Sequence, residues 1–81
     1  MNKERKNELG AVILDSAITV HRVLGPGLLE SVYRRALRQE LELRNLFIRE
    51  HIPVNLFYKG FDLGKGYEID LFVENEIIIE I

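Results

Sequence analysis

The sequence predicts an α+β fold in which two helices precede a three-stranded antiparallel sheet. Apolar residues recur at helical spacing in the first half of the chain, whereas short apolar runs separated by turn-forming residues fill the second half. The segment Gly25-Pro26-Gly27 divides the helical half in two. Proline disfavours helical geometry in the residue before it, and the glycines permit a tight turn. The 81 residues are expected to form one domain at most.

The first helix is expected from about residue 4 to residue 23. Its apolar positions follow an amphipathic pattern and are Leu9, Val12, Ile13, Ala17, Val20 and Leu24. A second helix is expected from about Leu28 to Arg44, with Asn45 as its stop. The buried side of this helix should carry Leu29, Val32, Tyr33, Ala36, Leu37 and Leu43.

Strands are expected at residues 47–58, 65–73 and 76–81. The segments Lys59-Gly60 and Gly64-Lys65-Gly66 are interpreted as the turns that break the apolar pattern. Pro53 has no backbone amide to donate to a neighbouring strand. The first strand should therefore lie at a sheet edge or contain a bulge.

Composition narrows the class of protein. The chain has no cysteine, so it has neither a disulfide nor a thiolate metal site, and a zinc site of the usual nitrogen and sulfur type is not expected. Its polar amino terminus does not resemble a signal peptide, and no apolar run approaches the ~20 residues of a membrane span. We expect a cytoplasmic protein without membrane contact. A net charge of −2 means that any nucleic-acid binding needs a local basic patch.

Two carboxylates in apolar runs point to a cation site. Asp70 lies within the run 67–73 and Glu80 within the run 77–81. An ionised carboxylate in an apolar environment needs a partner or a metal ion. A three-residue loop at 74–76, with Asn75 in left-handed geometry, would place Asp70 opposite Glu80 on one sheet face. A two-residue loop would place them on opposite faces, so the hypothesis depends on the loop.

Two glutamates project from the apolar side of the second helix. Glu40 is interpreted as the partner of Arg44, one turn later. Glu30 allows two interpretations: it either favours the helix dipole near the amino-terminal end, or it joins Asp70 and Glu80 as an additional acidic group.

Other polar and aromatic residues carry weaker signals. His21 is interpreted as a helix-terminus cation or packing residue rather than a ligand. A set of arginines on the second helix is interpreted as solvated surface, with phosphate contact as the alternative: Arg34, Arg35 and Arg38. Strand aromatics are expected to pack the sheet, with base stacking as the alternative: Tyr58, Phe61 and Tyr67.

The segment Gly27-Leu28-Leu29-Glu30-Ser31-Val32-Tyr33 resembles the signature of the GxxExxY proteins. The preceding residues 20–26 resemble the lead-in of that family, and the similarity extends through residues 58–60, 70–71 and 79–80. This family is grouped with the PD-(D/E)xK nuclease-like superfamily. The superfamily core has a helix, a three-stranded antiparallel unit, a second helix and a further strand. The resemblance implies that the expected elements are the first part of such a core.

The resemblance also implies roles for particular residues. Asp70 and Glu80 would hold Mg²⁺ or Mn²⁺, with the carbonyl of Ile81 as a further ligand and Glu30 as an auxiliary acid. The complete parent protein would then be a metal-dependent phosphodiesterase. In the family a lysine follows the position of Ile81, where this sequence stops. We therefore expect an incomplete, truncated domain that is inactive by itself.

Two other functional classes remain open. The chain can serve as a non-catalytic nuclease-like module that binds protein or nucleic acid. The apolar run 77–81 would present an exposed strand edge, which is a template for pairing with a second copy of the chain. A symmetric dimer that buries this strand or the adjoining helices is the expected assembly.

Overall fold

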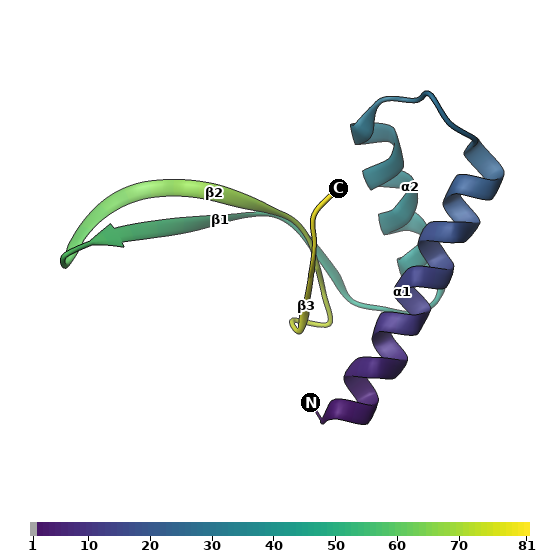
Figure 1. The fold of residues 1–81 in the computed structure, drawn as a ribbon, viewed down its shortest axis with the longest axis horizontal. Coiled ribbons are helices and arrows are strands. Elements are labelled where there is room, and N and C mark those ends of the chain that lie inside the picture. The colour runs from purple at the N-terminus through teal and green to yellow at the C-terminus, as the bar shows by residue number, and fades with distance from the viewer. Residues whose placement is uncertain (1) are drawn as a thin grey trace.

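The computed structural model describes residues 2–81 and has two helices followed by a three-stranded antiparallel sheet, as the sequence predicted (Figure 1). Helix α1 spans Lys3–Leu24 and helix α2 spans Glu30–Leu43. The side chain of Asn2 caps α1 by accepting a hydrogen bond of 2.8 Å from the Arg5 amide. No helix within residues 2–81 combines the length and the apolar character that crossing a membrane requires.

The turn between the helices delays the start of α2 by two residues relative to the prediction. The helix begins at Glu30, because Leu29 stays extended with ψ 146°. The Leu28 amide meanwhile donates a hydrogen bond of 3.2 Å to the Tyr33 hydroxyl. Gly25 has φ 74°, a region that favours glycine, and ends α1. At the other end of α2, Asn45 has φ 64° and lies just beyond the helix, as predicted.

The strands are β1 (Ile48–Tyr58), β2 (Phe61–Val73) and β3 (Ile77–Ile79), in the order β1-β2-β3. Strand β1 is an edge strand, which agrees with the expectation drawn from Pro53. The predicted turn at Lys59-Gly60 is confirmed. The predicted turn at Gly64-Lys65-Gly66 is wrong, because these residues lie inside β2 and continue to pair with β1 through register shifts. Gly64, with φ 80°, accommodates that irregularity.

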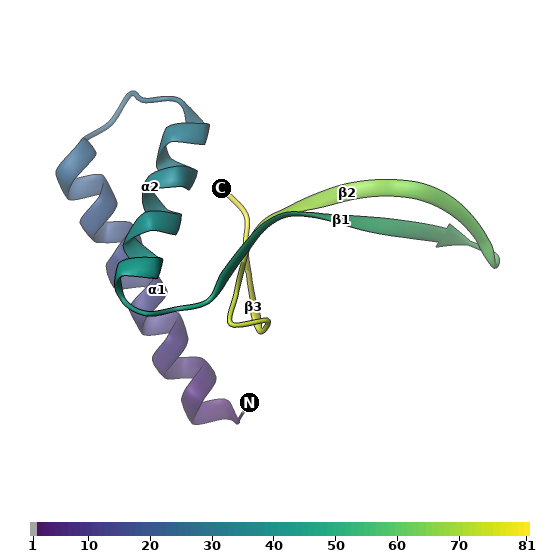
Figure 2. The same ribbon diagram turned by 180° about the vertical axis from the view of Figure 1, so that it is seen from behind.

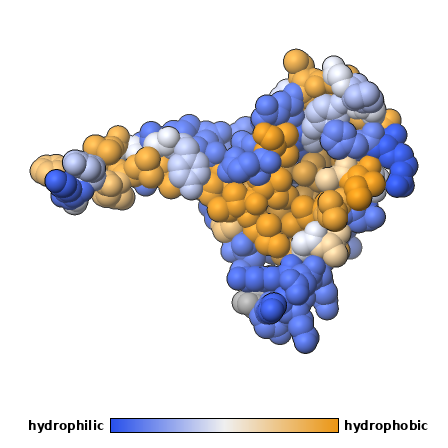
Figure 3. Space-filling model, viewed as in Figure 1, coloured by the Kyte–Doolittle hydropathy of each residue, from blue (hydrophilic) through white to orange (hydrophobic). Residues whose placement is uncertain are grey.

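The core lies where the helices cover one face of the sheet. Its buried residues are Leu9, Val20, Leu37, Leu41, Leu71 and Val73. Ser16 is also fully buried, and its hydroxyl donates a 2.7 Å hydrogen bond to the Val12 carbonyl, which satisfies the polar group. Figure 3 shows apolar side chains gathered where the helices meet the sheet.

A long ribbon of β1 and β2 extends away from this core (Figures 1 and 2). We call residues 55–66, beyond the paired residues Val54 and Tyr67, the distal ribbon. Neither helix covers it, and its large apolar side chains are exposed: Leu56, Phe57, Tyr58, Phe61 and Leu63. The remainder of the molecule, which contains the core, is called the base.

Candidate functional site

The β2–β3 hairpin brings together the two carboxylates that the sequence singled out. Val73 pairs with Ile77, so the loop at 74–76 has three residues, and Asn75 has φ 53°. Both features agree with the prediction. Pairing continues through Leu71 and Ile79, so the same register carries Asp70 to the position opposite Glu80, one residue beyond β3. The two carboxylates therefore share one side of the sheet, away from the buried Leu71 and Val73.

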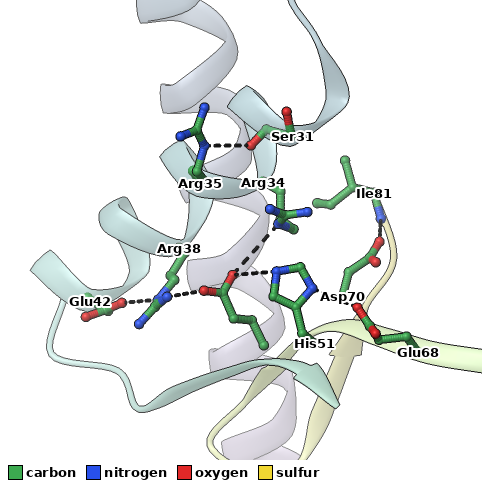
Figure 4. Close-up of polar contacts among 10 residues, drawn as sticks. Ser31, Arg34, Arg35, Arg38, Glu42, His51, Glu68, Asp70 and Ile81 are labelled. Carbon is green, nitrogen blue, oxygen red and sulfur yellow. Dashed lines mark hydrogen bonds and ion pairs between the residues drawn. The ribbon is translucent and has the colours of Figure 1, made fainter. Parts of the chain in front are cut away.

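Asp70 is anchored to the backbone next to Glu80. Its Oδ2 atom accepts a hydrogen bond of 2.9 Å from the Ile81 amide (Figure 4). The carboxylate is half-buried, whereas Glu80 is exposed. One oxygen of Asp70 is thus fixed by the chain, and Oδ1 has no hydrogen bond within residues 2–81. The described part of the chain therefore places Asp70, Glu80 and Ile81 in one neighbourhood.

Glu80 and Ile81 also border a pocket of about 200 Å³ between the helices and the end of β3. The other residues around it are Ala17, Val20, His21, Tyr33, Leu37 and Ile79. Most of these side chains are aliphatic. The rings of His21 and Tyr33 stack in parallel with their centroids 4.9 Å apart, so His21 has the packing role that was expected of it.

Tyr33 has a structural role that the sequence reasoning missed. Its hydroxyl donates a 2.5 Å hydrogen bond to the Gly25 carbonyl and accepts one from the Leu28 amide. One side chain thereby satisfies two backbone groups in the turn between the helices. The signal was the tyrosine in the segment 27–33, whose hydroxyl needs a polar partner when it is partly buried.

Glu30 is not joined to the carboxylate pair. It is exposed at the first residue of α2, and no hydrogen bond or ion pair links it to Asp70 or Glu80 in the described chain. Residues 2–81 contain no group of three or more histidine, aspartate or glutamate side chains arranged to hold a metal ion. The oxygen donors brought together by the hairpin are therefore the pair Asp70 and Glu80. The auxiliary role of Glu30 remains a prediction.

Glu40 has the partner that was expected. It accepts a 2.9 Å hydrogen bond from Arg44, which also contacts Asp15 on α1 at 2.7 Å. These contacts, with the Glu40 hydrogen bond as the largest contribution, raise the pKa of Arg44 above its ordinary value. Arg44 therefore ties the end of α2 to α1, and Glu40 belongs to this tie rather than to the carboxylate pair.

A cluster of charged residues between α2 and β1 was not predicted as a unit. We call Arg34, Arg38, Glu50 and His51 the arginine cluster (Figure 4). Arg38 forms an ion pair with Glu50 through Nη1 and a 2.6 Å hydrogen bond with Glu42 through Nε. Arg34 is only 22% exposed and faces Glu50, so the interpretation of Arg34 as plain solvated surface is wrong, whereas the side chain of Arg38 remains 41% exposed. Arg35 is exposed and donates a 3.3 Å hydrogen bond to the Ser31 carbonyl.

Glu50 could have been found from strand periodicity. Burial alternates along β1, with Ile48, Glu50 and Ile52 half-buried and the residues between them exposed. A glutamate at an inward position of such a strand needs a cationic partner. The alternation was visible in the sequence, but the partner lies on α2 and depends on how the helix packs.

The contact between Arg34 and Glu50 is incomplete. Arg34 Nε and Glu50 Oε2 are 3.8 Å apart, beyond hydrogen-bonding distance, and both atoms are inaccessible to solvent without any hydrogen-bond partner. A buried polar atom left in this way costs about 1–3 kcal/mol. Arg34 therefore has unused hydrogen-bonding capacity.

The arginine cluster adjoins Asp70 through β1. Glu50 pairs with Leu71 and Ile52 with Ile69, so His51 lies opposite Asp70 on the neighbouring strand. His51 Nε2 is 3.8 Å from Glu50, and Nδ1 is 2.8 Å from Glu68. A hydrogen bond from Lys65 and a smaller contribution from His51 lower the pKa of Glu68. His51 thus lies between Glu50 and Glu68 at the strand position opposite Asp70.

Comparison with known proteins gives one family. The family model described as the PD-(D/E)XK nuclease superfamily matches residues 7–81. No curated protein and no solved structure gives a significant match. The matched range includes α1 from residue 7 onward, all of α2, the three strands and both carboxylates of the hairpin.

Proposed function

The chain belongs to the PD-(D/E)XK nuclease superfamily, and from this premise we propose that it carries the carboxylate half of a metal-dependent phosphodiesterase site. The observation that supports the proposal is the hairpin register, which puts Asp70 opposite Glu80. The substrate class would be nucleic acid. The finer resemblance to the GxxExxY proteins, carried by residues 27–33, is part of the same proposal.

The donor set fits a hard divalent cation. Two carboxylates and a nearby backbone carbonyl offer only oxygen, which suits Mg²⁺ or Mn²⁺, and no thiol is present to favour a softer metal. Asp70, Glu80 and the carbonyl of Ile81 would hold the ion, with Glu30 as an outer acid. When bound, such an ion neutralises developing phosphate charge and makes water a better nucleophile. The Ile81 amide would keep Asp70 oriented for this role through its 2.9 Å hydrogen bond.

Thermal denaturation with added metal tests the site. Mg²⁺ or Mn²⁺ should raise the melting temperature, because a ligand bound only by the native state stabilises it by mass action. Asp70→Asn and Glu80→Gln should each abolish the rise. Glu8→Gln, at an exposed position on α1 paired with Arg5, is the matched control and should retain it. An equal response in the wild type and both site variants would count against the proposal.

Turnover needs more than the carboxylates. The four lysines are Lys3 and Lys6 at the start of α1 and Lys59 and Lys65 on the ribbon. No hydrogen bond or ion pair links any of these lysines to Asp70 or Glu80 within residues 2–81, so we predict that the described residues do not cleave nucleic acid by themselves. Metal-dependent cleavage by the chain as printed would contradict this prediction.

A non-catalytic role in assembly is the second candidate. Strand β3 pairs with β2 on one edge only, and Ile78 and Ile81 remain 49% and 39% exposed. We propose that a second copy pairs along this edge to form a dimer. Sedimentation at micromolar concentration would measure a doubled mass, and Ile78→Lys should return it to the monomer value. A monomer in the wild type would exclude the dimer without affecting the metal test.

A further inference from the structure

The arginine cluster has a charge arrangement that the carboxylate pair does not explain. Arg34 and Arg38 converge on the single carboxylate of Glu50. Arg38 contacts it closely and also binds Glu42, whereas Arg34 remains 3.8 Å away without a hydrogen bond at Nε. The guanidinium of Arg34 is thus held near the sheet by an ion pair with Glu50 that lacks a hydrogen bond at Nε.

The position of Arg34 relates this guanidinium to the candidate site. Arg34 follows Tyr33, which borders the same pocket as Glu80 and Ile81. Its partner Glu50 precedes His51, and His51 lies opposite Asp70. In Figure 4 the guanidinium of Arg34 projects from α2 toward the sheet, where the side chains of His51 and Asp70 emerge from neighbouring strands. Arg34 is therefore linked to the strand position opposite Asp70 through Glu50, which lies 3.8 Å from both Arg34 Nε and His51 Nε2.

We propose that Arg34 binds a phosphate group of the nucleic-acid backbone beside the Asp70 and Glu80 pair, and that Glu50 competes for it when no nucleic acid is bound. This inference rests on the proposed function, since it takes a phosphodiester as the substrate. A guanidinium presents a planar fork of donors that matches two phosphate oxygens, and it stays charged at all accessible pH values. Because it cannot accept a proton, Arg34 would position the substrate without activating water.

If Glu50 and phosphate compete for Arg34, removing the charge of Glu50 has a different effect from removing one half of a purely structural ion pair. If Glu50 only fixed the packing of α2 on β1, removing its charge would weaken the fold and any binding that depends on the fold. If it restrains Arg34, removing its charge releases Arg34 and Arg38 and strengthens phosphate binding. The variant Glu50→Gln keeps the size of the side chain and one acceptor oxygen while it removes the charge, so it separates the two roles.

The test is fluorescence anisotropy of a short fluorescein-labelled single-stranded DNA, titrated with the 81-residue chain in EDTA. Arg34→Gln should raise Kd about tenfold and reduce the salt dependence by roughly one phosphate contact. Glu50→Gln should lower Kd about threefold or more, as expected for release of a competing charge. Arg35→Gln is the matched control: it makes the same charge change at the adjacent, exposed residue and should alter Kd less than about twofold.

Several results of this titration would overturn phosphate binding by Arg34. Equal weakening by Arg34→Gln and Arg35→Gln would show general charge attraction and overturn it, as would an unchanged or higher Kd for Glu50→Gln. Circular dichroism checks the fold, and if Arg34→Gln does not fold, the Glu50→Gln titration alone distinguishes restraint of Arg34 from a purely structural ion pair. The DNA titration contains EDTA and so does not depend on divalent ions. A failed DNA titration therefore does not affect the metal-dependent rise in melting temperature, and a failed melting experiment does not affect the DNA titration. Tighter binding of an acidic peptide than of DNA would instead assign Arg34 to a protein partner and overturn the proposal.

Discussion

The base and the distal ribbon are built from the same two strands but are stabilised in different ways. In the base, β1 and β2 pack under the helices, and Leu71 and Val73 are fully buried. In the distal ribbon the strands pair only with each other, and Phe57 and Phe61 are 66% and 73% exposed. Backbone pairing between β1 and β2 therefore continues well beyond the point where their side chains are buried.

The contrast shows what each region requires from its sequence. The base depends on apolar side chains in the right register, because a one-residue slip would turn Leu71 away from the helices. The distal ribbon depends on its turn, where Lys59 and Gly60 have φ values of 49° and 86°. A two-stranded ribbon is marginally stable in water, so we expect it to open far more readily than the base.

The largest expected difference is between matched truncations in the two regions. Leu71→Ala removes a fully buried side chain and should lower the free energy of unfolding by about 2–5 kcal/mol. Phe57→Ala removes an exposed one and should change it by less than about 0.5 kcal/mol. Urea denaturation followed by circular dichroism measures both. Comparable losses would mean that the distal ribbon is covered in solution, for example by a second chain.

A smaller effect is expected in the turn between the helices. Tyr33→Phe keeps the ring that stacks on His21 but removes the hydroxyl that contacts Gly25 and Leu28. The loss should be about 1 kcal/mol, the usual contribution of a hydrogen bond. Hydrogen exchange at the Leu28 amide should quicken, while amides of the distal ribbon should exchange as before. Faster exchange in both regions would show that the ribbon depends on the helices.

A substitution within the distal ribbon should have a local effect. A Cβ atom added at Gly66 would lie 2.2 Å from the Cγ and Cδ1 atoms of Leu56, so that side chain must move. Leu56 is 45% exposed and has room to rotate, so Gly66→Ala should cost under about 1 kcal/mol. Ribbon resonances should shift in NMR spectra while those of the base stay in place. In a Leu56→Ala background, Gly66→Ala should shift the other ribbon resonances much less, and equally large shifts in both backgrounds would contradict the steric explanation.

The two regions also differ in how well the sequence predicts them. Helical spacing located both helices but misassigned part of the buried face of α2, since Leu29 and Leu43 are 75% and 68% exposed whereas Leu41 is fully buried. The register of Val73 with Ile77 followed from the length of the loop and brought Asp70 opposite Glu80. The extension of β2 through Gly64 was missed, because glycine serves equally well in a turn and in a bulge. A short-range pattern cannot distinguish these two uses.

The candidate site shows the same limit. The carboxylate pair lies on one hairpin, and local rules were sufficient to place it. The contact of Arg34 with Glu50 joins α2 to β1, and it depends on how the helix packs on the sheet. Glu30 was grouped with the carboxylates through a family resemblance, and no described contact links it to them. Contacts that form through tertiary packing between separate elements could not be predicted from local sequence patterns.

The smallest predicted effect concerns pH at the junction between the two regions. Glu68 pairs with Pro53 where the ribbon leaves the base, and Lys65 and His51 hold the pKa of its carboxyl below the usual range. A lowered folded-state pKa means that the stabilisation is present above the unfolded-state pKa, about 4.3, and is lost as pH falls through the folded value. Acidification should therefore lower the hydrogen-exchange protection factors of amides in the distal ribbon before it lowers those of the base.

The variant Glu68→Gln isolates this contribution, because it removes the ionisable group and keeps its size. Its ribbon amides should have lower protection factors at neutral pH than those of the wild type, and these factors should change less on acidification. Glu4→Gln, in the first turn of α1, is the control and should leave the ribbon's pH response unchanged. The side chain of Glu68 is 34% exposed and its partners Lys65 and His51 are more exposed, so solvent screens these ion pairs and the difference should be confined to local opening. If acid instead lowers the protection of base and ribbon amides together in both the wild type and Glu68→Gln, the two regions unfold as one unit. The distal ribbon would then not be the less stable region.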